Sequence, residues 1–321
     1  MKNKYVFVAF MLSVILLVSF GLTNIYVSQN ESAEEDFVVV TSFYPMYIAT
    51  MNVIGDTEGV TLKNLSEPQT GCLHDFQLTP EDMKLLSKAD VFIINGGGIE
   101  SFMEEIAKQY PELVIIEACE GMELLCEEHE HEEEEEEHVH EEAHNHDVNA
   151  HAWMSVELYR MQIQNITEGL IEADPVHGEA YLANQALYDG KLSKLQEQQE
   201  ELQLLLQDQS AIMFHCAYDY IAMDYGLDVA FCMDLDEERQ VSAGEIAEVL
   251  GVIESEKVSY IFAEELYATS ICTMIQEEVD VHVVYLDPLT RGEYEADSYI
   301  QGMSKNMELI KEAFTDYEKN H

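Results

Sequence analysis

The chain has 321 residues, enough for two domains, and 47% of them are hydrophobic, which excludes a protein that is disordered throughout. Its formal net charge is -49, from 64 acidic and 15 basic residues, and such a chain repels phosphate backbones. We therefore exclude nucleic acid as a partner, and we expect the acidic surface to favour cations weakly and without selectivity.

The first 30 residues predict an export segment. Lys2 and Lys4 precede an apolar run over 5–27, which is longer than the ~7–15 apolar residues of a signal peptide and meets the ~20 needed to span a bilayer. No small-residue cleavage site follows, and no cysteine precedes Cys72 to carry a lipid. We expect an uncleaved signal anchor over 1–30, with a cleaved signal peptide as the alternative. In both cases the chain from 31 onward should lie on the extracellular side, because positive charges stay inside.

A polar tether at 31–36 is followed by alternating strand and helix patterns. We expect strands at 37–42, 60–65, 90–95 and 113–117, and helices at 44–54, after 79 and at 99–109. The helix after Thr79 is the best marked, because a capping threonine, a proline at the first helical position and two acidic residues follow one another. The alternation predicts a parallel sheet in an N-terminal α/β lobe over 37–178.

Residues 127–147 interrupt this lobe with a segment made almost only of Glu and His. Such a segment cannot bury enough apolar surface to fold, so we expect a disordered, mobile loop. Imidazoles and carboxylates can hold zinc transiently, which predicts an accessory role in collecting metal. The histidines concerned are His129, His131, His138, His140, His144 and His146. The alternative is a solvated acidic linker with incidental histidines.

A long helix over 179–209 should join this lobe to a second one. The segment has no proline and one glycine, its leucines recur at roughly helical spacing, and it would be ~45 Å long if continuous. The second lobe, 210–321, is expected to contain strands at 211–214, 229–233, 258–263 and 281–286, and helices at 217–225, 241–255, 268–278 and 296–316. The predicted fold is therefore α/β, with two lobes that each hold a parallel sheet flanked by helices, joined by one long rigid helix.

Three histidines outside the loop lie at the ends of predicted elements, where α/β folds place ligand contacts. His74 precedes the helix after 79, His151 precedes the only tryptophan, and His215 follows the strand at 211–214. Three neutral imidazoles suit Zn²⁺, and Asp287, at another strand end, could supply a fourth ligand. The alternative for each is a partly buried, hydrogen-bonded histidine. That alternative is our interpretation of His177, His282 and His321.

Four stretches carry a resemblance to a known family: 74–103 (HDFQLTPEDMKLLSKADVFIINGGGIESFM), 151–155 (HAWMS), 214–220 (FHCAYDY) and 261–275, with LDPL at 286–289 after it. In this order they resemble the zinc/manganese (cluster A-I) solute-binding proteins of ABC importers, from about residue 37 to the last helix. The Glu/His insertion before the second histidine is typical of zinc-specific members.

The resemblance implies a binding protein and not an enzyme. It implies that zinc is held between the lobes by His74, His151 and His215, with Asp287 as the least secure ligand, and is passed to an ABC permease in the membrane. His215 favours Zn²⁺ over Mn²⁺ or another divalent metal, because manganese members have a carboxylate at that position. We expect a monomer in which small lobe shifts and loop ordering accompany capture and release.

The sequence departs from the family beside each candidate ligand. Leu73 replaces a proline, Asn149-Ala150 replaces Asp-Pro, and Cys216 replaces an aspartate. These changes leave the histidines in place but alter the groups that fix each imidazole tautomer. The affinity and the metal preference of the site therefore depend on these neighbouring residues and cannot be carried over from the family.

Six cysteines are permitted to form disulfides in an exported chain, but their pairing cannot be deduced from the sequence: Cys72, Cys119, Cys126, Cys216, Cys232 and Cys272. Cys72 and Cys216 lie within two residues of candidate ligands, so an unpaired structural role, a thiolate ligand and a disulfide all stay open.

Two other functions remain as alternatives. One is an extracellular zinc hydrolase, although no GxSxG motif occurs in the sequence. The other is a zinc-sequestering or adhesive surface protein that works without a transporter.

Overall fold

The structure is a computed structural model that describes residues 36–67, 76–126, 148–206, 209–235 and 240–320, together with the single residues 11 and 19. The predicted anchor and nearly all of the tether, His74, Cys72, the Glu/His segment 127–147 and His321 lie outside these ranges. Among the helices that are described, none is long and apolar enough to cross a bilayer.

The first lobe is built on a four-stranded parallel sheet in the order β2-β1-β3-β4. Its strands are β1 (Phe37–Thr41), β2 (Val60–Asn64), β3 (Val91–Ile94) and β4 (Val114–Glu117). The inner strands are runs of β-branched and aromatic residues, and β3 is buried along its whole length, as expected of a strand covered on both faces. All four strands begin and end within one residue of the predicted positions.

The second lobe repeats this arrangement with the order β6-β5-β7-β8, again all parallel. Its strands are β5 (Ser210–Met213), β6 (Asp228–Cys232), β7 (Tyr260–Ala263) and β8 (His282–Tyr285). Within the described residues, His215 follows the central strand β5, whereas His151 and Asp287 follow the edge strands β4 and β8. Ligands of parallel α/β proteins bind at the carboxyl ends of the strands.

Helices cover both sheets. In the first lobe they are α2 (Tyr44–Ile54), α3 (Pro80–Leu86), α4 (Met103–Gln109) and α5 (Val156–Ala173), and in the second lobe α7 (Asp219–Tyr225), α8 (Ala243–Glu256), α9 (Glu265–Glu278) and α10 (Ser298–Asn320). The Thr79 side chain and Asp82 form the capping box that begins α3, so the predicted start of this helix is confirmed.

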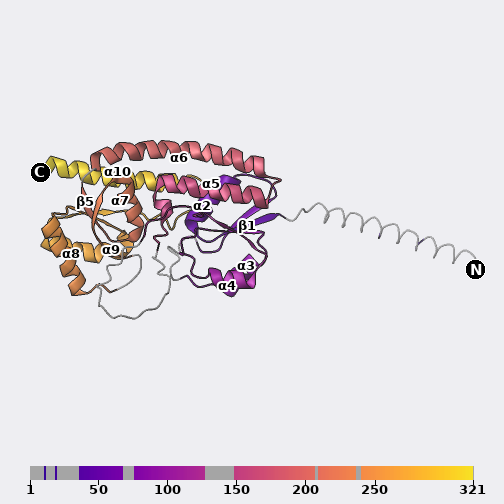
Figure 1. Cartoon of the computed structure of the whole chain (residues 1–321), viewed down its shortest axis with the longest axis horizontal. Helices are drawn as coiled ribbons and strands as arrows, with labels where there is room; N and C mark the ends of the chain where they lie inside the picture. The colour runs from indigo at the N-terminus through magenta and orange to yellow at the C-terminus, as the bar shows by residue number, and fades with distance from the viewer. Residues whose placement is uncertain are drawn as a thin grey trace, which may run out of the picture.

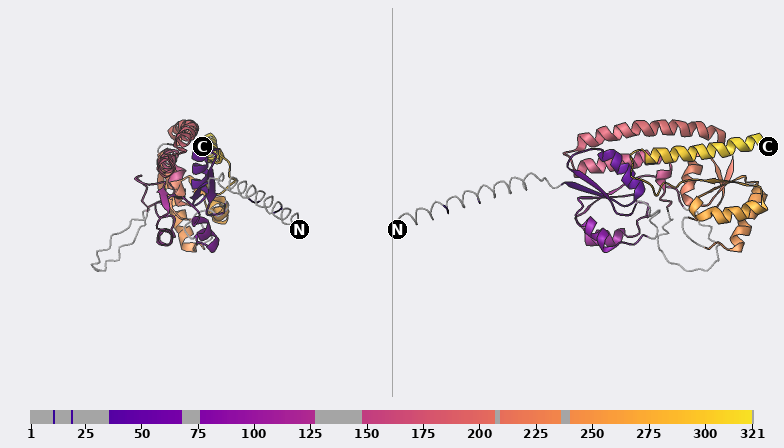
Figure 2. Two further views of the ribbon diagram at one scale, coloured as in Figure 1. Left: turned by 90° about the vertical axis from the view of Figure 1, so that its right-hand side faces the viewer. Right: turned by 180° about the vertical axis from the view of Figure 1, so that it is seen from behind.

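The long helix α6 (Gly178–Leu206) has 29 residues and lies across both lobes (Figures 1 and 2). Its buried stripe includes Tyr188, Leu192, Leu195 and Leu202, which follow helical spacing. One continuous core, which contains Val39 of β1 and Ile310 of α10, runs under this helix from lobe to lobe. The predicted two-lobe α/β fold with a long joining helix is confirmed.

One helix was not predicted from the sequence. Ser155 caps α5 through a hydrogen bond from the Leu158 amide, and Tyr159, Ile163 and Ile166 face the core. This is helical spacing after a good capping residue, so the signal was present. Polar and β-branched residues between those positions weaken the local helix preference, and packing against α2 and α6 decides the outcome.

Candidate metal site

His151 reaches the site from the first lobe. It lies at the start of a short 3-10 turn, η1 (Ala152–Met154), directly before α5, and it is fully buried. Trp153 anchors this turn to the second lobe, since its Nε1 donates to the Pro288 carbonyl at 2.9 Å and Tyr299 Oη donates to the Trp153 carbonyl at 2.8 Å. The position of His151 is therefore fixed by contacts to both lobes.

His215 and Cys216 enter from the second lobe. β5 runs up to Met213, His215 is still extended (φ -162°, ψ 128°), and Cys216 begins the 3-10 turn η2 (Cys216–Tyr218). Because the backbone changes direction between them, the two adjacent side chains can face the same space. His215 is fully buried and Cys216 is 5% exposed.

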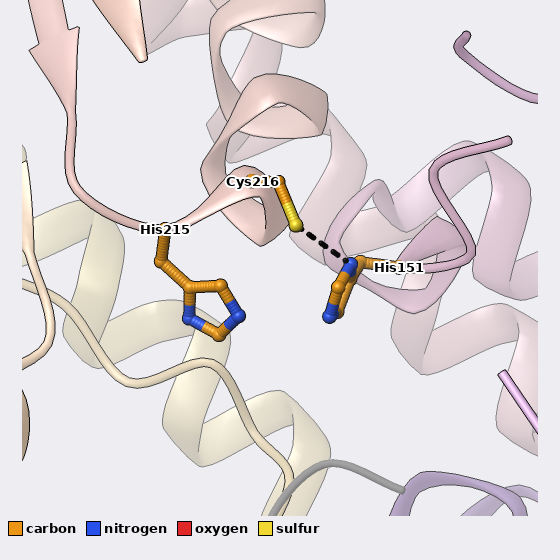
Figure 3. Close-up of side chains that lie close together, drawn as sticks. All are labelled: His151, His215 and Cys216. Atoms are coloured by element: carbon orange, nitrogen blue, oxygen red, sulfur yellow. Dashed lines mark hydrogen bonds between the residues drawn. The ribbon is translucent and has the colours of Figure 1, made fainter. Parts of the chain in front are cut away.

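These three side chains form a compact group between the lobes (Figure 3). The His151 and His215 rings meet edge to face, with centroids 5.1 Å apart. One potential ligand atom from each of His151, His215 and Cys216 lies within 4.8 Å of the others. Two buried imidazoles and a thiol at this spacing are a donor set that fits a divalent transition metal.

Asn149 fixes the tautomer of His151. Its Nδ2 donates to the Cys216 carbonyl at 2.7 Å, which sets the orientation of the amide, and its Oδ1 lies 3.0 Å from His151 Nδ1. An amide oxygen can only accept, so Nδ1 of His151 carries the proton. The Nε2 lone pair is then left for a metal, in the way that hydrogen-bonded metal ligands are usually oriented.

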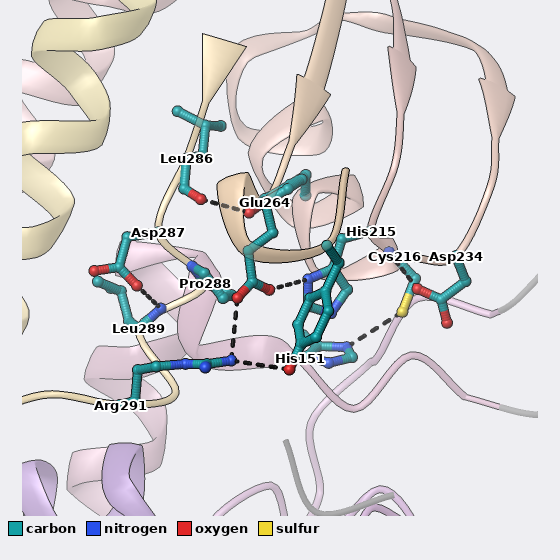
Figure 4. A network of polar contacts seen from close by, with 12 residues as sticks. His151, His215, Cys216, Asp234, Glu264, Leu286, Asp287, Pro288, Leu289 and Arg291 are labelled. Atoms are coloured by element: carbon teal, nitrogen blue, oxygen red, sulfur yellow. Dashed lines mark hydrogen bonds and ion pairs between the residues drawn. The ribbon is translucent and has the colours of Figure 1, made fainter. Parts of the chain in front are cut away.

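A carboxylate plays the corresponding part for His215. Oε2 of Glu264, which directly follows β7, lies 3.6 Å from His215 Nδ1, and its Oε1 pairs with Arg291 Nη2 at 3.1 Å (Figure 4). This separation is longer than a normal hydrogen bond, but the negative charge still favours a proton on Nδ1. Nε2 of His215 is then the atom that can bind metal. Figure 3 shows one ring nitrogen of each histidine facing the space between the rings.

Asp287, the predicted fourth ligand, makes other contacts. Its Oδ1 accepts from the Leu289 amide at 2.8 Å, and it is not part of the close group of potential ligands. It lines a cavity of about 320 Å³ with Tyr44 and Arg291, and in Figure 4 it lies on the opposite side of Glu264 from His215. Burial raises the pKa of Asp287 above its usual range, which disfavours the charged form that binds metal. Its role as a ligand stays a prediction.

The remaining histidines considered in the sequence either lie outside the described residues or lie away from the site. His74 and the six loop histidines lie outside the described residues. His177 and His282 lie elsewhere in the fold, the first 2.6 Å from Asp174 Oδ2 and the second stacked on Tyr260. Glu264 was not predicted from the sequence, although its place directly after β7 is the same strand-end position that pointed to His215.

A buried carboxylate also supports the first lobe's half of the site. Glu100 accepts from the amides of Asn95 (2.8 Å) and Gly96 (3.1 Å) and from Ser42 Oγ (2.8 Å). Asn95 in turn donates from Nδ2 to the Ala150 carbonyl at 2.9 Å, next to His151. Burial raises the pKa of Glu100 to about 7 despite these donors. The segment that carries His151 is thus held by a chain of polar contacts.

The sequence pattern of the family described as zinc-uptake complex component A, periplasmic, matches residues 39–313. The high-affinity zinc uptake system protein ZnuA of Bacillus subtilis is 29% identical over 292 residues, which cover 88% of this chain and 89% of ZnuA.

Two solved structures share the fold. FpvC of Pseudomonas aeruginosa, in complex with Ni²⁺, gives a TM-score of 0.74 at 24% identity and covers 88% of this chain and 98% of FpvC. Zn(II)-bound AdcA of Streptococcus pneumoniae gives 0.71 at 25% identity, with 87% of this chain covered. The match spans only 58% of AdcA, so AdcA has a large part without a counterpart in this alignment.

Proposed function

This chain belongs to the zinc-uptake complex component A family, and on that premise we propose that it captures Zn²⁺ outside the cell and hands it to an ABC permease. Membership makes it a solute-binding component of a divalent-metal uptake system and not an enzyme. Zinc as the particular cargo is the proposed step. Two relatives whose names include zinc, ZnuA of Bacillus subtilis and Zn(II)-bound AdcA, support it, as do the two buried histidines at the site.

One observation carries the proposal: two fully buried imidazoles, one from each lobe, present ring nitrogens to the same space. Asn149 and Glu264 hold the opposite ring nitrogens, so each ring is prepared to offer Nε2. We assign His151 and His215 as zinc ligands, and His74 as the third from the family resemblance. Neutral nitrogen donors in a dry site suit Zn²⁺ better than Mn²⁺, which prefers oxygen.

The lobes are proposed as 37–178 and 210–321, with 179–209 as the joining helix, and the chain as a monomer. Because α6 and the continuous core tie the lobes together, capture should need only small shifts around the site. Asn149 is placed to couple these shifts to binding, since it touches the Cys216 carbonyl of the second lobe and orients His151 of the first.

Two outer parts complete the proposal. We assign 1–30 as an export segment that either stays as a membrane anchor or is cleaved, and 127–147 as a weak zinc collector that raises the local metal concentration. Both assignments rest on composition.

The test is a zinc titration of the chain from residue 31 onward, with and without 127–147, and with His215→Ala in each form. We expect one tight site that survives deletion of the loop and is lost with His215→Ala. His282→Ala, a histidine on β8 stacked on Tyr260, is the control and should bind normally. If zinc binding is lost on deletion of 127–147 and is unaffected by His215→Ala, the chain is a His-rich metal buffer and the proposed importer function is wrong.

Zinc binding should also weaken below about pH 6, because the imidazoles must be neutral to bind. Affinity measured at pH 7 and pH 5 checks this, and unchanged affinity at pH 5 would contradict a histidine site. A sequestering or adhesive protein would bind zinc equally well, so a zinc-uptake defect on deletion and co-purification with a permease separate that alternative. Turnover of esters or peptides would instead indicate a zinc hydrolase.

A further inference from the structure

We propose that Cys216 Sγ is itself a ligand of the transported metal, so that this chain holds zinc in a mixed nitrogen–sulfur site that excludes Mn²⁺. The inference rests on the proposed function, because it concerns the same site. It starts from a feature particular to this chain, a cysteine beside the second-lobe histidine.

The backbone of Cys216 is held from both sides. Its amide donates to Asp234 Oδ1 at 3.3 Å, and its carbonyl accepts from Asn149 Nδ2 at 2.7 Å. With both groups engaged at the first residue of η2, the side chain is directed toward His151 (Figures 3 and 4). A thiol whose only role was to fill the core would need no such placement between two histidines.

The distances agree with a shared metal. One potential ligand atom of each of His151, His215 and Cys216 lies within 4.8 Å of the other two, and Cys216 Sγ also contacts the proton-bearing side of the His151 ring, 3.6 Å from Nδ1. With Zn–N near 2.0–2.1 Å and Zn–S near 2.3 Å, tetrahedral zinc separates its nitrogen and sulfur ligands by about 3.5–3.6 Å. For Sγ and one nitrogen of each ring to share an ion, separations of up to 4.8 Å would therefore have to shorten by about 1–1.5 Å, within the small lobe shifts proposed above.

The sulfur also decides which metals bind. On binding, the S–H bond breaks, the sulfur keeps the electron pair and bonds the metal, and the proton leaves to solvent, so one proton is released per metal from this residue. A thiolate is a soft ligand that favours Zn²⁺ and disfavours Mn²⁺, which prefers oxygen. Cys216 is thereby a specificity-determining residue, and an aspartate there would make the site more permissive.

Co²⁺ added at one equivalent to the full chain provides the first test, because a thiolate bound to Co²⁺ gives an intense near-ultraviolet charge-transfer band that imidazole ligands do not give. We expect the band in the unaltered chain and in Cys272→Ser, which removes a buried thiol from the core of the second lobe. Cys216→Ser should lose the band and weaken zinc binding at least about tenfold, since even outer partners of metal ligands contribute about 10–100-fold.

Cys216→Asp should keep zinc binding but narrow the preference for Zn²⁺ over Mn²⁺. The zinc complex of the unaltered chain gives a check that needs no variant, because X-ray absorption should show one sulfur at about 2.3 Å beside nitrogen at about 2.0 Å. A band that persists in Cys216→Ser, or zinc bound without a sulfur ligand, would overturn the inference about Cys216. If zinc binding still depends on His215 in that case, the proposed function stands. If no form binds metal through His215, the proposed function itself is wrong.

Discussion

The two histidines of the site are supported by different chemistry. His151, on the first lobe, is oriented by Asn149, a neutral amide that also reaches across to the second lobe. His215, on the second lobe, is oriented by the carboxylate of Glu264, whose charge is balanced by Arg291. A charged partner makes an imidazole a stronger donor than a neutral one does. His215 should therefore bind metal more strongly, and His151 should respond more to the relative position of the lobes.

This difference suggests an order of events. In the proposed site, metal arriving at His215 would meet a ligand whose orientation is set within one lobe. His151 would join only when Asn149 lies against η2, because the same amide makes both contacts. Loss of the interlobe contact would free the His151 ring and lower affinity, which is what release to a permease requires.

Among the residues that orient the two histidines, the largest effect should come from Glu264→Ala. It removes the group that directs His215 and leaves Arg291 without its carboxylate, so we expect zinc affinity to fall about 10–100-fold. Glu264→Gln keeps an acceptor for Nδ1 but no charge, and it should lose less. Competition titration with a chelator measures both. Equal and small losses would mean that His215 is not oriented by this residue.

Asn149→Ala should have the next largest effect. It removes a neutral hydrogen bond to His151 and leaves the Cys216 carbonyl without this donor, so we expect about a tenfold loss of zinc affinity. The dissociation rate should rise as well, since the amide bridges the lobes. Stopped-flow release to a chelator tests this. A variant with weaker affinity but an unchanged dissociation rate would contradict the proposed coupling between lobes.

Much of this arrangement could be predicted from the sequence. The alternation of strands and helices fixed the two sheets, and strand-end positions pointed to His151 and His215. The conformation of α5 depended on packing against α2 and α6, which a local pattern does not contain. Glu264 follows β7 directly, but its strand-end position did not distinguish it among 64 acidic residues before the fold brought it beside His215.

Asp287 is the reverse case, a residue that was predicted as a ligand but makes other contacts in the structure. Its strand-end position was correctly located, but its carboxylate accepts from the Leu289 amide two residues on, a local bond that aspartates commonly make in turns and that here engages Oδ1. Cys216 lies between these cases. That Cys216 is adjacent to the candidate ligand His215 was evident from the sequence. That its side chain points toward His151 could be seen only in the structure.

A smaller effect concerns the first lobe's own carboxylate, Glu100, which is linked to the segment of His151 through Asn95. Burial raises its pKa from 4.5 to about 7, so the folded state holds the proton more tightly than the unfolded state. The contribution of Glu100 to stability is therefore fully present below about pH 4.5 and falls as pH rises to about 7, by roughly 3 kcal/mol at 1.36 kcal/mol per unit.

Urea unfolding of the metal-free chain from residue 31 onward, with and without Glu100→Gln, isolates this contribution. The amide loses one acceptor for the backbone, so the variant should be less stable at pH 5 by about 1–3 kcal/mol, and the gap should narrow by pH 8. A gap that is the same at both pH values would show that Glu100 is already ionised at pH 5. The first lobe would then hold a full charge linked through Asn95 to the segment of His151, and the contrast with Glu264 would weaken.

The smallest effect is expected from Asp287→Ala. Because its carboxylate caps the Leu289 amide and faces the cavity beside Glu264, zinc affinity should fall by less than about tenfold, below the range for groups that contact metal ligands. Asp287→Asn, which can still accept from Leu289, should bind zinc as the unaltered chain does. A loss as large as that of Glu264→Ala would place Asp287 on the metal, as the family resemblance implied. The second lobe would then supply two charged groups to the site, and the contrast between the lobes would be sharper than the contacts of Glu264 alone suggest.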